Sequence, residues 1–567
     1  MPSSPHTQSL RRTVALQPDH FQAWVMLADA ELDEGQLQAG AQAAQRALQL
    51  RPGHPEALAR LGRAHWQGGQ PTRAVQLLRQ ASQAAPGHPG IALWLGHALE
   101  DAGPEHAEAA AEAYRHAHLL APQVPYIAAQ RLNWQRRLCD WEGLQALSDQ
   151  VRQAVANGDA NVEPFAFLSE PASAAEQLAC ARQRASALSA PPLAMPPVAR
   201  STSSPPLQVG WLSNGFGNHP TGLLTVALAE ALAHQPGIQL HLFATTAQDG
   251  SPIAQRLAAA GQWHALHGHS HQAIAQCIAE HHIDVLFDLR GWGGGGTPEV
   301  LARRPAPVQV NWLAYPGTSG APWIDWVLAD AFVLPPALEA HFSERVMRLP
   351  HAFQPSDTQR VALPAPTRSA CGLPDTGTVF CCFNNSYKLN PRSFQRLMAV
   401  LQGVAGSVLW LLSGPGQAND RLRAAARAAG IDPARLVFMD KLPHEQYLAR
   451  YALADLFLDT SPYNAHTTAS DALWSGCPVL TVPGETFADR VAGSLNHHLG
   501  MPQLNCADEA GFIATAIGLG NDPAALARLR GELAQRRQYS TLFDMDGFAR
   551  HFADACQQMH AAGSAAP

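Results

Sequence analysis

The sequence lacks several patterns that mark whole classes of protein. Its nine cysteines are scattered and form no CxxC pair, which argues against a disulfide framework or a zinc site of that type. No apolar run approaches the roughly 20 residues of a membrane helix, and the N-terminal MPSSPHTQSLRR has no apolar centre typical of a signal peptide. We therefore predict a cytoplasmic protein with reduced thiols and no membrane partner.

Charged residues are also few, at 15% of the 567 residues, and the net charge is −7. This balance does not favour nucleic acid as a partner. The sequence has 26 histidines, but the pairs at 281–282 and 497–498 suggest no ligand partners at helical spacing, so we predict no bound metal. The length predicts two to four domains.

A period of 34 residues organises residues 1–122. Prolines recur at intervals of 34, 34 and 36 residues, at Pro18, Pro52, Pro86 and Pro122. Small residues repeat in phase with them, at Ala28, Gly62 and Gly96. Small residues let paired helices approach closely and proline ends a helix, as in tetratricopeptide repeats. We predict an α-helical tetratricopeptide superhelix that binds protein or peptide segments; a purely structural cap for the next domain is the alternative.

Residues 123–206 differ in composition from the repeats. They read as non-repeating helices to about residue 188, and then as a proline-rich segment that cannot continue a helix. We predict a helical connector and a linker that ends at a domain boundary.

From residue 207 onward, strand-like runs alternate with helical ones. The strand-like runs are LQVGWL, IQLHLFA, DVLFDL and VQVNWL, and then TVFCCF, SVLWLL, RLVF, LFLDT and PVLTVPGE. Such alternation predicts parallel sheets covered by helices, with ligands at the carboxyl ends of the strands. We predict two facing Rossmann-like α/β domains at 207–375 and 376–545, followed by a C-terminal helix and tail at 546–567.

Two loops of the first α/β domain carry candidate site residues. SNGFGNHPTG follows the first strand and places His219 at the mouth of the cleft, as a base, a hydrogen-bond donor or a phosphate contact. Pro316, Gly317, Thr318 and Ser319 follow VQVNWL. We expect their amides and two hydroxyls to be exposed to a phosphorylated or polyhydroxylated ligand.

Two further segments belong to the second α/β domain. NNSYKLNP carries Lys388, which could neutralise a diphosphate leaving group; a solvated lysine is the alternative, and no DxD cluster for Mg²⁺ lies nearby. NAHTTASDALWSG opens a helix at His466, Thr467 and Thr468. Free N–H groups and the positive end of the helix dipole suit a phosphate there, although a merely well-capped helix would give the same pattern.

Taken together, these segments resemble the protein O-GlcNAc transferases, inverting glycosyltransferases with two Rossmann-like domains (the GT-B architecture) fused to tetratricopeptide repeats. The matching segments run in the family's order from about residue 207 to 545: GFGNHPT, RPAPVQVNWLAYPGTSGA, FNNSYKLNP, SVLWLL, LADLFLDT, NAHTTASDALWSGCPVLTVPGET and DRVAGS. The resemblance implies transfer of N-acetylglucosamine from UDP-N-acetylglucosamine to Ser or Thr hydroxyls of protein acceptors. It implies no metal and no cofactor besides the donor substrate.

The resemblance also implies roles for individual residues. His219 and Lys388 match the catalytic positions, Lys388 as the contact of the diphosphate leaving group. The implied substrate-binding residues are Pro316, Gly317 and Thr318 near the sugar, Asn385 before the lysine, Leu442, Tyr447 and Arg450 at the uridine, His466, Thr467 and Thr468 at the diphosphate, and Asp471 at the ribose. Asn385 and Tyr447 differ from animal members, which carry Gln and His, and the long insert of those members is absent.

Two alternatives remain open at the level of the sequence. One is an enzyme of the same architecture with another donor or acceptor, such as GDP-fucose, or glucose transferred onto Asn. The other is a non-catalytic scaffold that senses a nucleotide sugar while the repeats bind partners.

Overall fold

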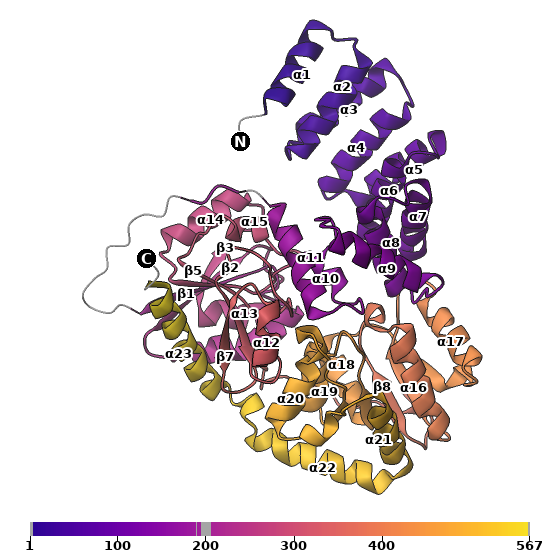
Figure 1. Cartoon of the computed structure of the whole chain (residues 1–567), viewed down its shortest axis with the longest axis vertical. Coiled ribbons are helices and arrows are strands. Elements are labelled where there is room, and N and C mark those ends of the chain that lie inside the picture. Colours follow the sequence, from indigo (N-terminus) through magenta and orange to yellow (C-terminus); the bar gives the residue numbers. More distant parts are fainter. Residues whose placement is uncertain (1–3, 189, 194–205, 565–567) are drawn as a thin grey trace. The chain divides into compact units, whose positions relative to one another are not determined.

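The computed structural model describes residues 4–188, 190–193 and 206–564 (Figure 1). The chain forms two compact units. The first contains the residues up to Val151 together with Gly414–Leu422, and the second contains Arg152–Ser413 and the residues from Arg423 onward. Most of the predicted proline-rich linker at 189–206 lies outside the described residues.

The first unit is a series of antiparallel helix pairs. The helices are α1 (Pro5–Leu16), α2 (Phe21–Asp33), α3 (Leu37–Leu50), α4 (Pro55–Gln67), α5 (Pro71–Ala84), α6 (Pro89–Ala102), α7 (Ala107–Leu120), α8 (Pro125–Arg137) and α9 (Leu144–Ala156), the last of which continues into the second unit. A Cβ atom on Gly62 would lie 2.7 Å from Leu78 Cγ, and one on Gly96 would lie 2.7 Å from the Tyr114 ring. The repeated small residues therefore permit close helix packing, as predicted.

The second unit begins with the connector helices and contains a seven-stranded parallel sheet. Its strand order is β3-β2-β1-β4-β5-β6-β7, and β1 lies between β2 and β4, with Val209 paired to Leu240 on one side and Val285 on the other. The strands are β1 (Leu207–Ser213), β2 (Ile238–Ala244), β3 (Gln262–Ala265), β4 (Val285–Asp288), β5 (Val308–Asn311), β6 (Trp326–Asp330) and β7 (Arg345–Leu349). The helices are α10 (Pro164–Phe167), α11 (Ala174–Ser186), α12 (Pro220–Leu232), α13 (Pro252–Ala260), α14 (His271–Glu280) and α15 (Pro298–Leu301).

A second parallel sheet of five strands follows, in the order β10-β9-β8-β11-β12. Its strands are β8 (Val379–Cys382), β9 (Val408–Leu412), β10 (Leu436–Met439), β11 (Leu456–Leu458) and β12 (Val479–Leu480). Its helices are α16 (Pro391–Gly403), α17 (Ala418–Ala428), α18 (His444–Arg450), α19 (Thr467–Trp474), α20 (Val491–Leu499), α21 (Glu509–Asn521) and α22 (Pro523–Tyr539). The predicted architecture, helical repeats followed by two Rossmann-like domains, is confirmed.

The C-terminal helix α23 (Met545–Ser564) packs on the first sheet's domain rather than on the second (Figure 1). The Phe552 ring is fully buried, and its centroid lies 4.8 Å from Phe287, 5.2 Å from Trp312 and 6.1 Å from Trp211. This aromatic cluster lies on β1, on β4 and directly after β5, so the last helix completes the core beneath the strands that lead to the predicted site. No helix in the described ranges is long and apolar enough to cross a membrane.

Candidate active site

Helix α19 begins shortly after the carboxyl end of β11, as predicted. In the described part of the chain, its N-cap residue His466 makes no capping bond through its side chain, so this side chain does not satisfy the first N–H groups of the helix. The Thr467 and Thr468 side chains at this end are half-buried. The first N–H groups of a helix have no partner within the helix, and the dipole is positive at this end. This helix start can therefore bind an anion.

The loop that leads into α19 is held by the buried carboxylate of Asp459. Its Oδ1 accepts hydrogen bonds from the backbone N–H groups of Thr460 at 2.8 Å and Ala465 at 2.7 Å, and its Oδ2 accepts one from the Thr481 hydroxyl at 2.8 Å. Burial raises the pKa of Asp459, and these donors together with Lys388 oppose the rise. The helix start is thus fixed in place without a ligand.

Lys388 lies beside this helix start, on the short 3₁₀ turn Ser386–Lys388 after β8. Its Nζ donates a hydrogen bond to the Asn464 carbonyl at 2.6 Å and lies 3.8 Å from the Tyr463 ring centroid. The residue is only 7% exposed, so the alternative of a solvated lysine is wrong. Burial lowers the pKa of Lys388 to about 7, although Asp459 favours the charged form. A bound anion would raise this pKa and hold the ammonium charged.

His219 lies at the carboxyl end of β1 and is the N-cap residue of α12. Its Nδ1 accepts a hydrogen bond from the Thr221 N–H at 3.1 Å. Burial, assisted by Arg290, lowers the pKa of His219 to about 4, so the ring is neutral at pH 7. A neutral imidazole whose Nδ1 accepts carries its proton on Nε2. The free nitrogen of His219 is therefore a hydrogen-bond donor.

Arg290 is a site residue that the sequence reasoning did not predict. It follows β4 in the segment DLRGWGGGG, and its Nη1 lies 3.4 Å from His219 Nε2 and 3.5 Å from the Thr221 hydroxyl. Arg290 donates to Nε2 in the other tautomer of the His219 ring; in the tautomer assigned above both nitrogens donate, and an anionic ligand would be shared between them. Burial lowers the pKa of Arg290. The sequence did contain a signal for Arg290, because this residue closely follows the carboxyl end of a predicted strand.

Tyr463 connects the strand ends of the two sheets. Its buried ring lies against Lys388 from the second domain and shares an apolar cluster with Tyr315 from the loop after β5. Its ring centroid lies 5.0 Å from that of His466. Burial raises the pKa of Tyr463 well above its ordinary value, and the charge of Arg290 opposes this rise. The pair of His219 and Arg290 therefore belongs to the same site as Lys388 and the start of α19.

The loop Pro316–Ser319 differs from the prediction. All four residues are buried, and the carboxylate of Glu344 accepts hydrogen bonds from the Thr318 hydroxyl at 2.6 Å and from the Ser319 N–H. The expectation that both hydroxyls are exposed is wrong, because the buried Glu344 holds the Thr318 hydroxyl and the Ser319 hydroxyl accepts a bond from the Ala321 N–H at 3.3 Å. The Gly317 carbonyl accepts a bond from the Asn311 amide at 2.8 Å, which ties the loop to β5.

Asp471 lies one turn inside α19, and its carboxylate already has two partners. Arg360 Nη1 lies 2.6 Å from Oδ1, and His444 Nε2 lies 3.1 Å from Oδ2. Arg360 comes from the segment between the two sheets, and neither partner was predicted from the sequence. Both members of the Arg360–Asp471 pair are almost fully buried, with side chains 2% and 5% exposed. A carboxylate has about four lone-pair sites, so Asp471 can accept further hydrogen bonds.

The predicted uridine residues lie next to α19. Leu442 is in the loop between β10 and α18, and Tyr447 and Arg450 are on α18. The Tyr447 hydroxyl contacts that of Tyr451, which donates to the Thr468 carbonyl at 3.2 Å. Helix α18 is thereby joined to the first turn of α19. The side chain of Asn385 is exposed and lies at the start of the turn that carries Lys388.

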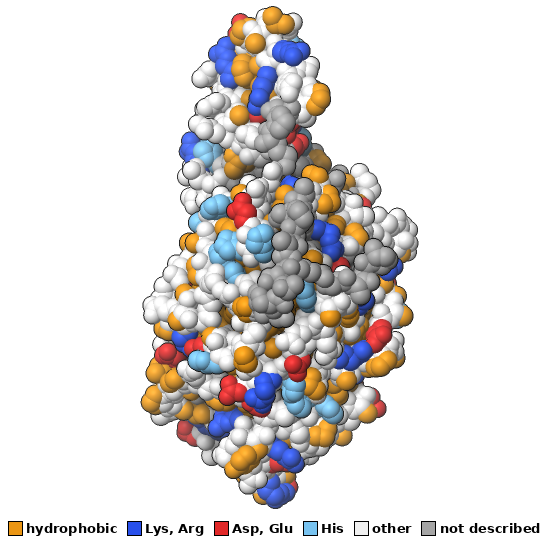
Figure 2. Space-filling model, turned by 90° about the vertical axis from the view of Figure 1, so that its left-hand side faces the viewer, with side chains coloured by type: hydrophobic (Ala, Val, Ile, Leu, Met, Phe, Trp, Pro, Cys, Tyr) orange, Lys and Arg blue, Asp and Glu red, His pale blue; other side chains and the backbone are white. Residues whose placement is uncertain are grey.

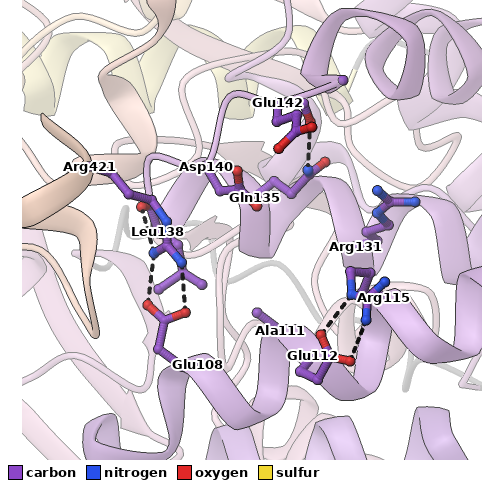
Figure 3. A pocket seen from close by; sticks show the side chains of 11 residues that line it. Glu108, Ala111, Glu112, Arg115, Arg131, Gln135, Leu138, Asp140, Glu142 and Arg421 are labelled. Carbon is purple, nitrogen blue, oxygen red and sulfur yellow. Dashed lines mark hydrogen bonds and ion pairs between the residues drawn. The ribbon is translucent and has the colours of Figure 1, made fainter. Parts of the chain in front are cut away.

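A separate polar cavity of about 650 Å³ lies in the first unit (Figure 3). Helices α7 and α8, the loop after α8 and the segment 414–422 line it. Glu108 accepts two hydrogen bonds from Arg421 at 2.7 and 2.8 Å, and Glu112 accepts two from Arg115 at 2.6 and 2.7 Å. The cavity is therefore lined by alternating acidic and basic groups.

Comparison with known families gives two matches. The profile described as Glycosyl transferase family 41 matches residues 164–364 and 356–552, which contain every residue of the site described above. A tetratricopeptide repeat profile matches residues 31–89.

Among curated proteins, the chain is 32% identical over 432 residues to SEC of Arabidopsis thaliana, a probable UDP-N-acetylglucosamine–peptide N-acetylglucosaminyltransferase. That alignment covers 72% of this chain and 44% of the relative. The UDP-N-acetylglucosamine–peptide N-acetylglucosaminyltransferase of Caenorhabditis elegans is 27% identical over 467 residues, covering 62% of this chain and 40% of the relative. The chain thus spans less than half the length of these curated relatives.

Among solved structures, a lysine-to-methionine variant of the O-GlcNAc transferase of Thermobaculum terrenum is similar over nearly the whole chain. The TM-score is 0.65 at 26% identity, and the similarity covers 96% of this chain and 98% of that one. The similarity therefore includes the helical repeats and both α/β domains.

Proposed function

Because this chain belongs to glycosyl transferase family 41, we propose that it transfers N-acetylglucosamine from UDP-N-acetylglucosamine to serine or threonine hydroxyls of proteins. The observation that carries this proposal is the buried Lys388 ammonium, held at 2.6 Å from the Asn464 carbonyl beside the helix start of α19. Two sources of positive charge there suit the diphosphate of a nucleotide sugar. The names of the relatives support this donor and the protein acceptor.

The donor is proposed to lie along α19. Its diphosphate would contact the N–H groups and hydroxyls of Thr467 and Thr468, and its ribose hydroxyls would donate to the free lone pairs of Asp471. Leu442, Tyr447 and Arg450 would hold the uracil base. The link from Tyr447 through Tyr451 to the Thr468 carbonyl supports a shared base and diphosphate site. Pro316 and Gly317 would limit the space around the sugar.

The reaction is an in-line displacement. The acceptor oxygen attacks the anomeric carbon, the bond from that carbon to the diphosphate oxygen breaks, and its electron pair remains on UDP while the configuration inverts. Lys388 and the start of α19 stabilise the charge that develops on UDP, and no cofactor or metal is proposed to take part in this step. Preorganised donors of this kind contribute on the order of 10²–10³ in rate each.

His219 is proposed to orient the substrates rather than to act as the general base. Its Nδ1 lone pair is taken by the Thr221 N–H, so its Nε2–H is available to donate to a phosphate or acceptor oxygen. Arg290, whose Nη1 lies 3.4 Å from this nitrogen, would bind the same anionic group. The acceptor proton must then pass to another group or to water.

The acceptor is proposed to be a protein that also contacts the helical repeats. The mixed-charge cavity at Glu108, Glu112 and Arg115 offers both donors and acceptors to an extended polypeptide (Figure 3). A cytoplasmic location is proposed on the basis of the cysteines. All nine lie within the described ranges and none is in a disulfide there.

Calorimetry with UDP and GDP, followed by mass spectrometry of acceptor proteins incubated with UDP-N-acetylglucosamine, tests the function. We expect UDP to bind at least about tenfold more tightly than GDP, a difference of about 1.4 kcal/mol. We also expect a mass increase of one N-acetylhexosamine on Ser or Thr. Tighter binding of GDP would indicate the fucose-type alternative. UDP binding without any transfer to acceptor proteins would indicate the scaffold.

A further inference from the structure

A second cluster of nitrogen and sulfur ligands lies at the edge of the first sheet and includes no residue of the site described above. His264 is on the edge strand β3, Cys277 is on α14, and His281 caps the end of that helix. One ligand atom from each of the three lies within 4.8 Å of the other two, and all three side chains are half-buried. Figure 2 shows histidine side chains gathered on this face of the molecule.

The sequence spacing supports a shared ligand. Cys277 and His281 are four residues apart and thus lie on the same face of the helix. Our expectation that the pair at 281–282 has no partner at helical spacing overlooked this cysteine. The third residue, His264, has its ring centroid 4.2 Å from that of His281. Strand β3 and helix α14 therefore present their ligands toward each other.

A relay of hydrogen bonds, from Gln208 through His241 to His264, sets which nitrogen of His264 carries the proton. The Gln208 amide nitrogen donates to the Pro206 carbonyl at 2.9 Å and to Gln239 Oε1 at 3.2 Å, so its oxygen is the atom 2.8 Å from His241 Nε2. His241 therefore carries its proton on Nε2 and accepts with Nδ1.

The other end of the relay is the bond between the two histidines. His264 Nε2 lies 3.0 Å from His241 Nδ1 and must donate to it, because His241 has its only proton on the opposite nitrogen. A neutral His264 ring that donates with Nε2 has no proton on Nδ1. The unprotonated Nδ1 of His264 is then free to bind a ligand. Such outer hydrogen bonds to a ligating histidine are typical of metal sites.

A hydrogen bond also sets which nitrogen of His281 carries the proton. Its Nδ1 lies 2.7 Å from the Cys277 carbonyl, which can only accept, so Nδ1 carries the proton and Nε2 keeps its lone pair. The ring also lies at the C-terminal end of α14, where the helix dipole favours a cation. Each histidine thus keeps one lone pair, on Nδ1 of His264 and on Nε2 of His281, although Cys277 Sγ lies 3.9 Å from Nδ1 of His281, the nitrogen that carries the proton.

We propose that His264, Cys277 and His281 bind a zinc ion. Hydrogen bonds from His264 Nε2 to His241, and from His241 to Gln208, hold the His264 ring in the orientation that the ion needs. Two imidazole nitrogens and one sulfur select zinc over the oxygen-preferring Mg²⁺ and Ca²⁺. On binding, Zn²⁺ replaces the proton of the Cys277 thiol, which passes to solvent, and a zinc–sulfur bond forms. Water takes the fourth position. The ion would join the edge strand β3 to α14, and this proposal does not depend on the proposed glycosyltransferase activity.

Cobalt titration of the chelator-treated full-length protein tests this site. Co²⁺ is the probe because its bond to a thiolate gives a charge-transfer band and a tetrahedral site gives visible d–d bands. We expect both at one equivalent, and their loss when Zn²⁺ displaces Co²⁺. Cys277→Ser should abolish the charge-transfer band. Cys371→Ser is the matched control, since Cys371 is also half-buried and has no place in the cluster.

The relay gives a finer test. His241→Phe removes no ligand but leaves His264 without its acceptor, and changes of this type weaken metal binding by about 10- to 100-fold. UDP binding by calorimetry and circular dichroism would show that each variant is folded. The proposal is overturned if the wild-type protein gives no charge-transfer band, or if the Cys277→Ser variant keeps it.

Discussion

The ammonium nitrogen of Lys388 and the carbonyl oxygen of Asn464 are 2.6 Å apart, although the residues are 76 positions apart in the chain. Asn464 stands two residues before the N-cap of α19, so this bond fixes the cation to the helix start. A lysine ammonium has three donors and the carbonyl uses one. The other two remain for an anion at the same place, which links the loop after β8 to the loop after β11 in a single diphosphate site.

The titration of Lys388 can be measured directly, because the chain has only two lysines, Lys388 and Lys441. Labelling with ¹³C-lysine should give two ε-carbon signals, and Lys441→Ala assigns them by removing one. We predict a midpoint near pH 7 for Lys388, since burial lowers its pKa to about 7. Saturating UDP should raise this midpoint by stabilising the ammonium. A midpoint above pH 10 without ligand would contradict the buried position.

The same pKa predicts how stability depends on pH. The pKa of Lys388 is lowered from 10.5 to about 7, so between these pH values the unfolded chain binds more protons than the folded one. The free energy of unfolding should therefore rise with pH across this window. Lys388→Met should remove this contribution to the pH dependence of the free energy of unfolding. Denaturant unfolding of both proteins at a series of pH values measures it, and identical pH dependence would count against the assignment.

His219 should contribute to the reaction as a hydrogen-bond donor. We predict that His219→Gln keeps much of the activity lost in His219→Ala, because the glutamine amide can donate where Nε2–H does. Since the pKa of His219 is lowered to about 4, the titration of this residue should produce no acid limb near pH 6.5 in the wild-type rate profile. The profile of kcat/KM against pH for the three proteins checks this. Equal loss of activity in both variants, together with a wild-type acid limb near pH 6.5 that both variants lack, would show that His219 acts as the general base.

The buried pair of Arg360 and Asp471 should matter for both stability and donor binding. Arg360→Met leaves a buried carboxylate with only His444 as its partner, and breaking a buried pair costs about 3–5 kcal/mol. We expect a lower free energy of unfolding and weaker UDP binding. The double variant Arg360→Met with Asp471→Leu should recover stability but not UDP binding. Recovery of both would show that Asp471 has no role at the ribose.

Helix α23 should stabilise the first α/β domain through Phe552. Truncating a buried phenylalanine costs about 3–5 kcal/mol, so we predict a loss of this size for Phe552→Ala, because its ring fills the space between Trp211, Trp312 and Phe287. Tyr539→Ala is the control, since that ring is 87% exposed. Equal stability of the two variants would show that the helix is dispensable.

The sequence predicted the parts of the site that lie in short continuous segments. The strand, turn and helix start around His466, and the strand end before Lys388, follow from local pattern. Arg360 and Asp471 are 111 positions apart, and no periodicity connects them. The burial of Thr318 likewise depends on Glu344, 26 residues further on, so its hydroxyl could not be recognised as occupied.

Edge elements of the fold were also missed, for a related reason. Strand β3 has four residues and no fully buried side chain, so it lacks the apolar run of a central strand. Its pairing with β2, and the meeting of His264 with α14, arise only from the tertiary structure. The packing of α23 on the first sheet is a similar case, because its apolar face does not indicate which domain it covers.

The central claim is that Lys388 stabilises the leaving diphosphate. The most direct measurement is the rate of UDP release and sugar transfer by Lys388→Ala, with Arg392→Ala as a control because that cation lies four residues further on and its side chain is 78% exposed. We predict a fall in kcat on the order of 10²–10³ or more for Lys388→Ala, with UDP binding still measurable and Arg392→Ala close to wild type. A Lys388→Ala protein that folds and transfers sugar at a near-normal rate would contradict the claim.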